Sequence, residues 1–114
     1  MDKLVKTFKA LSDSNRIRIL KMLEIKPLCV CEITEILGLA ASTVSQHLSI
    51  LKQAGFIFCH KENKYINYYL NTRSQRQYLK ELLPLIENWI RDETLIVRDR
   101  EKVKVVNRDK ICGI

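Results

Sequence analysis

Glycine, proline and long apolar runs are all scarce in this sequence. Three glycines and two prolines among 114 residues leave no flexible linker, so the chain is expected to be compact and mostly helical. No run reaches the roughly eighteen apolar residues of a membrane span, and no apolar stretch follows the basic N-terminal segment as it would in a signal peptide. We therefore expect a cytoplasmic protein.

Some kinds of chemistry are also missing. The sequence has no Cys-x-x-Cys motif and no alternation of strands and helices, which argues against an enzyme of thiol-disulfide exchange, and no enzymatic activity is expected. Four cysteines in a reducing compartment indicate metal binding or redox chemistry rather than structural disulfides. A net charge of +7 on so small a protein favours nucleic acid as a partner.

Apolar residues at helical spacing predict two helices in the N-terminal part of the chain. The first covers residues 3–11 and the second residues 15–24. On the second helix, Arg16, Arg18 and Lys21 are expected to face outward as a basic side, while the apolar residues between them face the core.

A helix-turn-helix is predicted next along the chain. A short helix ends at Gly38, and a second helix begins after Ala40 and is closed by Gly55. Runs of β-branched and aromatic residues at 56–60 and 65–70 then predict a β-hairpin, which would form a wing. The expected fold class is mainly α with one β-hairpin, a winged helix-turn-helix.

The C-terminal part is expected to begin with one long helix. Apolar residues at intervals of three and four continue over residues 79–96, and Pro84 is the only position at which this helix would kink. Residues 100–114 show no clear period, so strand, frayed helix and loose tail remain alternatives. We expect a domain over residues 1–98 and a tail over residues 99–114.

The predicted second helix of the helix-turn-helix has a polar face suited to reading DNA bases. Small hydrogen-bonding side chains lie opposite its apolar stripe, and the N-terminal half of such a helix enters the major groove. Ser42, Gln46 and His47 are the first candidates for base contacts. The whole candidate set on this face is Ser42, Thr43, Ser45, Gln46, His47 and Ser49.

Lysine and arginine side chains around that helix are candidates for holding DNA phosphates. Such contacts set affinity more than sequence preference. The candidates are Arg16 and Arg18 upstream, Lys52 downstream, and Lys61 and Lys64 at the tip of the hairpin.

Three segments resemble the ArsR/SmtB family of metal-sensing repressors. They are Leu11–Leu23 (LSDSNRIRILKML), Ser42–Gly55 (STVSQHLSILKQAG) and the wing ending in Tyr68–Leu70. The resemblance implies a homodimer that pairs through its first and last helices. It also implies binding to double-stranded operator DNA, repression in the metal-free state, and release from DNA when the inducer binds.

The segment Leu28–Glu32 (LCVCE) resembles the CVC signature of the family's arsenic, antimony and cadmium/lead branches. Residues two apart on an ideal helix point about 200° from one another, so Cys29 and Cys31 can hold one ion only if the helix start is not ideal. A helix N-terminus also lowers a thiol pKa, which would supply the thiolates that a soft metal needs. Metal binding would then distort the helix that braces the recognition helix.

Trivalent arsenic or antimony prefers three thiolates, and the third is not fixed by the sequence. The position three after Cys31, often cysteine in the family's arsenic sensors, is Thr34. We favour Cys112 as the third metal ligand, because a tail can reach the site in its own or the partner chain. Cys59 is less suited, because its place on a predicted strand suggests simple packing.

We therefore expect As(III) or Sb(III) as the inducer and no organic cofactor. Alternatives within the same fold are a response to cadmium or lead, and a response to thiol oxidation or persulfidation. The family's zinc and nickel branches place histidines on the last helix, whereas this chain has only His47 and His60, both elsewhere. An oxygen-rich site is disfavoured, because carboxylates such as those of Asp92, Glu93 and Asp99 usually serve solvation.

Overall fold

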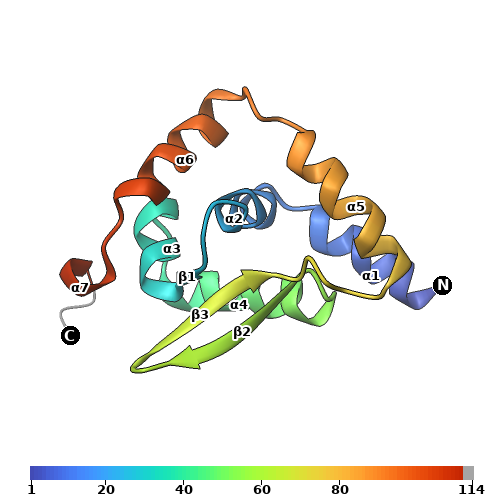
Figure 1. Cartoon of the computed structure of the whole chain (residues 1–114), viewed down its shortest axis with the longest axis horizontal. Coiled ribbons are helices and arrows are strands. Elements are labelled where there is room, and N and C mark those ends of the chain that lie inside the picture. Colours follow the sequence, from blue (N-terminus) through green and yellow to red (C-terminus); the bar gives the residue numbers. More distant parts are fainter. Residues whose placement is uncertain (112–114) are drawn as a thin grey trace.

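The computed structural model describes residues 1–111. It confirms the predicted fold class, mainly α with one β-hairpin in the order of a winged helix-turn-helix (Figure 1). None of the described helices is long and apolar enough to cross a membrane. The elements are α1 (Asp2–Leu11), α2 (Ser14–Leu23), β1 (Leu28–Cys29), α3 (Val30–Leu37), α4 (Ala41–Gln53), β2 (Ile57–Glu62), β3 (Tyr65–Leu70), α5 (Gln77–Asn88), α6 (Thr94–Val105) and α7 (Arg108–Ile111).

The helix ends in the N-terminal half follow from capping chemistry. Asp13 precedes α2, and its Oδ1 accepts the N–H groups of Asn15 (2.8 Å) and Arg16 (3.1 Å), which satisfies donors at the helix start. Gly38 ends α3 with φ 70° and ψ 27°, a left-handed conformation that glycine adopts at little cost. The chain can therefore turn sharply from α3 into α4.

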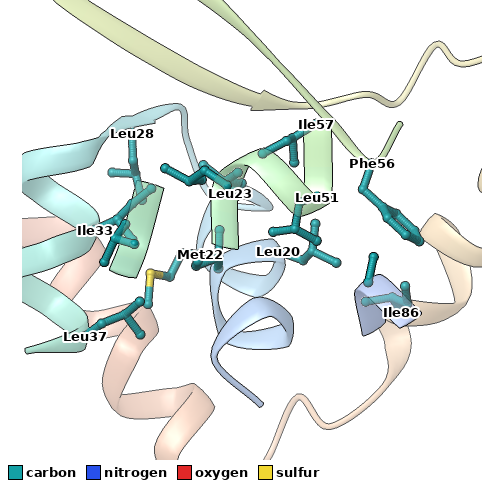
Figure 2. Packing of buried hydrophobic residues seen from close by; sticks show 14 of the residues in the cluster. Leu20, Met22, Leu23, Leu28, Ile33, Leu37, Leu51, Phe56, Ile57 and Ile86 are labelled. Carbon is teal, nitrogen blue, oxygen red and sulfur yellow. The ribbon is translucent and has the colours of Figure 1, made fainter. Parts of the chain in front are cut away.

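The core fixes the orientation of α3 and α4. Side chains from α2, α3 and α4 and from the base of the sheet converge in one cluster (Figure 2). Because these side chains are close-packed, α3 cannot shift without disturbing its neighbours. The members labelled in the figure are Leu20, Met22, Leu23, Leu28, Ile33, Leu37, Leu51, Phe56, Ile57 and Ile86.

The hairpin belongs to a three-stranded sheet. Its order is β1-β3-β2, and both strand pairs are antiparallel. Cys29 of β1 lies opposite Asn67 of β3, which in turn lies opposite His60 of β2. The sequence analysis did not predict β1, because a strand of two residues has no readable alternation. This strand places the first cysteine of the CVC motif on the sheet.

The prediction of one long C-terminal helix is wrong. Residues 89–93 separate α5 from α6, and Pro84 lies inside α5 without ending it. At the break, Ile90 has φ 51°, a conformation that is costly for a β-branched residue. Figure 1 shows α5 beside α1, and α6 crossing towards α3. The expected domain boundary between residues 98 and 99 falls within α6.

Two of the three basic residues expected on the outer side of α2 are engaged inside the protein. The Lys21 side chain is buried, and its Nζ donates to the carbonyl oxygens of Ile86 (2.8 Å) and Glu87 (3.2 Å) near the end of α5. Arg18 donates from Nε (2.8 Å) and Nη2 (3.0 Å) to the buried carboxylate of Asp99 on α6. The expectation of an outward-facing basic side is wrong for these two residues, because α5 and α6 bind α2 through them.

Candidate DNA-binding face and cysteine site

Helix α4 separates an apolar stripe from a polar face. Val44, Leu48 and Leu51 are 0% exposed, and the polar residues between them face away from the core. None of the side chains that the structure describes caps the N-terminus of α4, so its first N–H groups remain available to a phosphate. Of the candidates on this helix, the exposed ones are Ser42, Thr43, Ser45, Gln46, Ser49 and Lys52.

His47 is half-buried and lies against Arg16. The Nη1 of Arg16 is 3.2 Å from Nδ1 of His47. The same guanidinium donates to the carbonyl oxygens of Ala10 (2.9 Å) and Lys9 (3.0 Å) at the end of α1. Arg16 therefore joins α1 to the recognition helix, and this engagement limits its freedom to follow a phosphate.

The wing carries its basic residues at the exposed tip. Lys61 near the end of β2 and Lys64 in the turn are exposed, and Asn63 in the same turn adopts φ 58°. The hairpin contacts α4 along β2, and Figure 1 shows the two elements next to each other. The structure thus places the wing beside α4 through β2, whereas the Arg18 side chain is paired with Asp99 on α6.

Cys29 occupies the N-cap position of α3. Its backbone is extended, with φ −92° and ψ 169°, and it forms a capping box with Glu32, in which each side chain receives the other residue's N–H. The Cys29 N–H donates to Oε1 of Glu32 at 3.0 Å. Cys29 thus lies outside the helix while Cys31 lies in its first turn. The helix start is not ideal at Cys29, which is the condition that two sulfur ligands two residues apart require.

The ionisation of Cys29 differs from the expectation. Burial raises the pKa of the Cys29 thiol, and the negative charge of Glu32 adds to this effect. The hydrogen bond from the Glu32 N–H and the positive charge of Arg108 act in the opposite direction but do not outweigh burial. The expectation that the helix N-terminus lowers the pKa of this thiol is therefore wrong, because the side chain is only 3% exposed.

The other described cysteines differ in their surroundings. Cys31 is half-buried and disulfide-bonded, whereas Cys29 and Cys59 are free thiols. Residues directly opposite one another in a sheet share a face, and neighbours along a strand alternate. Since Cys29 shares a face with Asn67 and His60, Cys59 points to the other face. The pleat separates Cys59 from Cys29.

Cys112 lies outside the described residues. The last described helix before it is α7, which lies close to α3. Helix α7 packs on α3, and Nη2 of Arg108 donates to Oε1 of Glu32 at 3.0 Å. Tyr65 of the wing donates its hydroxyl to Oδ1 of Asp109 at 3.0 Å. Ile111, the last described residue, ends this helix.

Carboxylates and histidines do not assemble a second site in the described part of the chain. Among residues 1–111, no group of three His, Cys, Asp or Glu side chains could hold a metal ion. The Asp99 carboxylate is paired with Arg18. Thr34 stands where the family's arsenic sensors often have a third cysteine. Its hydroxyl is buried without a hydrogen-bond partner among these residues.

Sequence reasoning missed Glu32 and Arg108. The spacing of Cys29 and Glu32 is that of a capping box, so Glu32 had a readable signal, although cysteine is an unusual N-cap. Arg108 had none, because its partners are far away in the sequence and its own segment shows no period.

The fold, the recognition helix and the basic wing define a winged helix-turn-helix DNA-binding protein. The family model for "Bacterial regulatory protein, arsR family" matches residues 13–57, which include the helix-turn-helix. The chain belongs to the ArsR family, and it is therefore a transcriptional regulator and not an enzyme.

Three curated relatives illustrate the range of the similarity. The "Uncharacterized HTH-type transcriptional regulator MJ1325" of Methanocaldococcus jannaschii is 37% identical over 87 residues, which cover 75% of this chain and 93% of the relative. A cadmium resistance regulatory protein CadC homolog of Staphylococcus aureus is 35% identical over 79 residues, covering 68% and 65%. The arsenical resistance operon repressor of Escherichia coli is 32% identical over 68 residues, covering 59% and 58%. The match thus spans less than two thirds of the latter two proteins.

Solved structures give the same result for the fold. HlyU from Vibrio cholerae N16961 superposes with a TM-score of 0.63 and 31% identity, covering 76% of this chain and 90% of HlyU. A second structure, described as reduced HlyU, matches with the same TM-score and identity and covers 87% of its chain.

Proposed function

We propose that this protein is a homodimeric repressor that leaves its operator when a thiol-seeking ion binds to Cys29 and Cys31. One observation carries the proposal: Cys29 caps α3, and α3 packs on the recognition helix α4. A ligand that rearranges the start of α3 therefore acts on the element that positions α4.

The proposed DNA contacts fall into two groups, contacts to base edges and contacts to phosphates. Ser42, Gln46 and His47 would contact base edges from the N-terminal half of α4, with the other small polar residues of that face beside them. Lys61 and Lys64 on the wing, and Lys52 on α4, would hold phosphates and set the salt dependence of binding. Arg16 would act through His47, whose ring it touches. Arg18 is left out of the proposed contacts, because its guanidinium is paired with Asp99.

The proposed dimer is supported by apolar side chains that the single chain leaves exposed. Phe8 of α1 is 55% exposed and Leu85 of α5 is 46% exposed. Together with Leu4, Tyr78 and Leu82 they line one hollow between the two helices. Contiguous exposed apolar surface of this kind is typical of an interface, and a two-fold axis there would pair the first helix with the C-terminal part of the chain.

The proposed ligand set is Cys29, Cys31 and Cys112 in the reduced protein, because a disulfide-bonded Cys31 has no thiolate to offer an ion. The chemistry of soft thiolates favours As(III), Sb(III), Cd²⁺ or Pb²⁺ over hard ions. Three thiolates suit the trivalent metalloids, and we take As(III) or Sb(III) as the inducers to test first. Helix α7, which packs on α3 immediately before Cys112, supports Cys112 as the third ligand. The relatives include both cadmium and arsenical regulators, so cadmium is the main alternative.

Binding would act on α3 through its cap. To bring both sulfurs onto one ion, the Cys29 thiol would lose its proton and turn from the position in which it caps α3. The buried side chains of α3 transmit the resulting shift to α4 and change the spacing between the two recognition helices of a dimer. Coupling free energies of about 1 to 3 kcal/mol suffice for this kind of regulation.

A thiol-oxidation response is the second candidate. The disulfide-bonded state of Cys31 supports it. In that case peroxide or polysulfide, and not metal ions, would release the protein from DNA.

The test is the fluorescence anisotropy of a labelled operator with reduced protein, titrated with arsenite, antimonite, Cd²⁺ and Zn²⁺, and separately with peroxide. Cys29→Ser is the informative variant, because serine is itself a good N-cap and removes the sulfur while keeping the cap. Cys59→Ser is the matched control. We expect arsenite or antimonite to release wild type and Cys59→Ser but not Cys29→Ser, Cys31→Ser or Cys112→Ser. Equal DNA binding with and without every ion would overturn the proposal.

A further inference from the structure

A small set of contacts joins α7 to both α3 and the wing. The Arg108 guanidinium donates to Glu32 at 3.0 Å, and its Cζ lies 4.7 Å from the centre of the Tyr65 ring. The next residue, Asp109, accepts the Tyr65 hydroxyl at 3.0 Å. One turn of helix thus contacts α3 on one side and the first residue of β3 on the other.

Glu32 is the centre of this set. Its Oε1 accepts both the Cys29 N–H and Arg108 Nη2, each at 3.0 Å. The Glu32 side chain is 4% exposed and that of Arg108 is 23% exposed. A carboxylate at this depth needs a charged partner to offset its desolvation, and Arg108 supplies it. The position of α7 is therefore fixed relative to the cap of α3.

Tyr65 is well placed to hold the wing tip. It pairs with Glu62 across the hairpin, directly next to the two-residue turn. A two-stranded hairpin tip has few interactions of its own and is marginally stable without support. The cation over the Tyr65 ring and the Asp109 contact give the tip a third point of attachment, outside the sheet.

We propose that Arg108 is a positioning residue for DNA binding: α7 straps the wing tip to the cap of α3, and Arg108 holds the strap closed. In this proposal the strap fixes the angle between the wing and α4 before DNA binds. The inference deepens the proposed function, because it assigns the wing, as well as α4, to the elements that the cysteine region controls. It needs no inducer to be tested.

The test compares Arg108→Ala with Lys104→Ala in the full-length reduced protein. Lys104→Ala is the matched control. It also removes one positive charge and breaks one ion pair with a carboxylate, that of Glu101, but this pair is exposed. Amide hydrogen exchange over residues 60–67 and operator affinity are measured without inducer. We expect Arg108→Ala to exchange faster in the hairpin tip and to bind the operator about five-fold more weakly, the size of one net hydrogen bond. Lys104→Ala should leave the exchange unchanged and weaken binding only as much as the loss of one charge does.

A double-mutant cycle separates the strap from general destabilisation. Arg108→Ala and Tyr65→Leu should be non-additive in operator affinity, because both open the same contact, whereas Lys104→Ala should add to Tyr65→Leu. Unchanged exchange in the hairpin tip of Arg108→Ala, or strict additivity with Tyr65→Leu, would overturn the strap. Failure of every ion to release wild type would overturn the proposed inducer response and leave the strap intact.

Discussion

The recognition helix and the C-terminal helices use their apolar residues differently. In α4, the apolar stripe is entirely covered by the rest of the same chain, as Leu48 at 0% exposure shows. In α5 and the segment after it, Leu85 (46%), Trp89 (49%) and Ile90 (38%) stay exposed. The DNA-reading part is thus complete within one chain, while the C-terminal part presents a surface that a second copy would cover.

The largest effect should follow from a cavity under α4. Leu48→Ala removes a fully buried side chain and should lower the free energy of unfolding by about 3 kcal/mol. Leu85→Ala, in the exposed part of α5, should lower it by less than about 1 kcal/mol in dilute protein. Chemical denaturation monitored by circular dichroism measures both values. Equal losses would mean that the two regions do not differ as described.

The attachment of α6 to α2 should come next. Asp99→Ala leaves the Arg18 guanidinium without its buried partner and should cost about 2 to 3 kcal/mol. Asp92→Ala removes an exposed carboxylate and should change stability by less than about 0.5 kcal/mol. The readout is the melting temperature of each variant. If Asp99→Ala has the same melting temperature as wild type, the ion pair does not hold α6 in place.

The exposed apolar surface is tested by oligomeric state. Phe8→Glu places a charge in the hollow between α1 and α5 and should weaken the proposed dimer at least about ten-fold, since a buried unpaired charge is costly. Ile66→Glu makes the same kind of change on the wing, where Ile66 is 48% exposed, and should leave the dimer intact. Sedimentation equilibrium distinguishes them. Retention of the wild-type association constant in Phe8→Glu would place the interface elsewhere.

The polar face of α4 should set sequence preference. Gln46→Ala should weaken operator binding by about 1 to 2 kcal/mol and bring operator and random DNA closer in affinity. Competition with unlabelled random DNA gives the ratio of the two affinities. An unchanged ratio would remove Gln46 from the set of base contacts.

The smallest effect is expected at the wing tip. Lys64→Ala should weaken binding to every DNA sequence by a similar factor and reduce the slope of log affinity against log salt by about one. Titrations at several salt concentrations measure this slope. A sequence-dependent loss would instead give Lys64 a role in base reading.

The sequence was most informative where a residue's partners lie nearby along the chain. Gly38 predicts the end of α3, and the apolar spacing of α4 predicts its buried stripe, because capping and helical periodicity are local. Arg18 and Lys21 were assigned to the surface by the same local reasoning. Their partners on α6 and α5 lie more than sixty residues away, and no spacing within α2 could reveal them.

The C-terminal part was predicted less well for a physical reason. The chain breaks at Ile90 without a glycine or a proline, and the proline that is present lies within α5. A break of this kind depends on how α6 packs against α2 and α3, which is information that the segment itself does not contain. The cysteine site was intermediate: the CVC motif was visible, whereas the burial that raises the pKa of Cys29 was not.

The contact between Arg16 and His47 has a consequence for the spacing of the two recognition helices in a dimer. A single guanidinium binds the last carbonyls of α1 and lies against the side of α4, so it ties the helix at the proposed two-fold axis to the proposed recognition helix. In the proposed dimer, the arrangement of the two α1 helices at the axis would then influence the separation of the two recognition helices. A change in the crossing angle of the two α1 helices would then shift both α4 helices relative to the DNA at once.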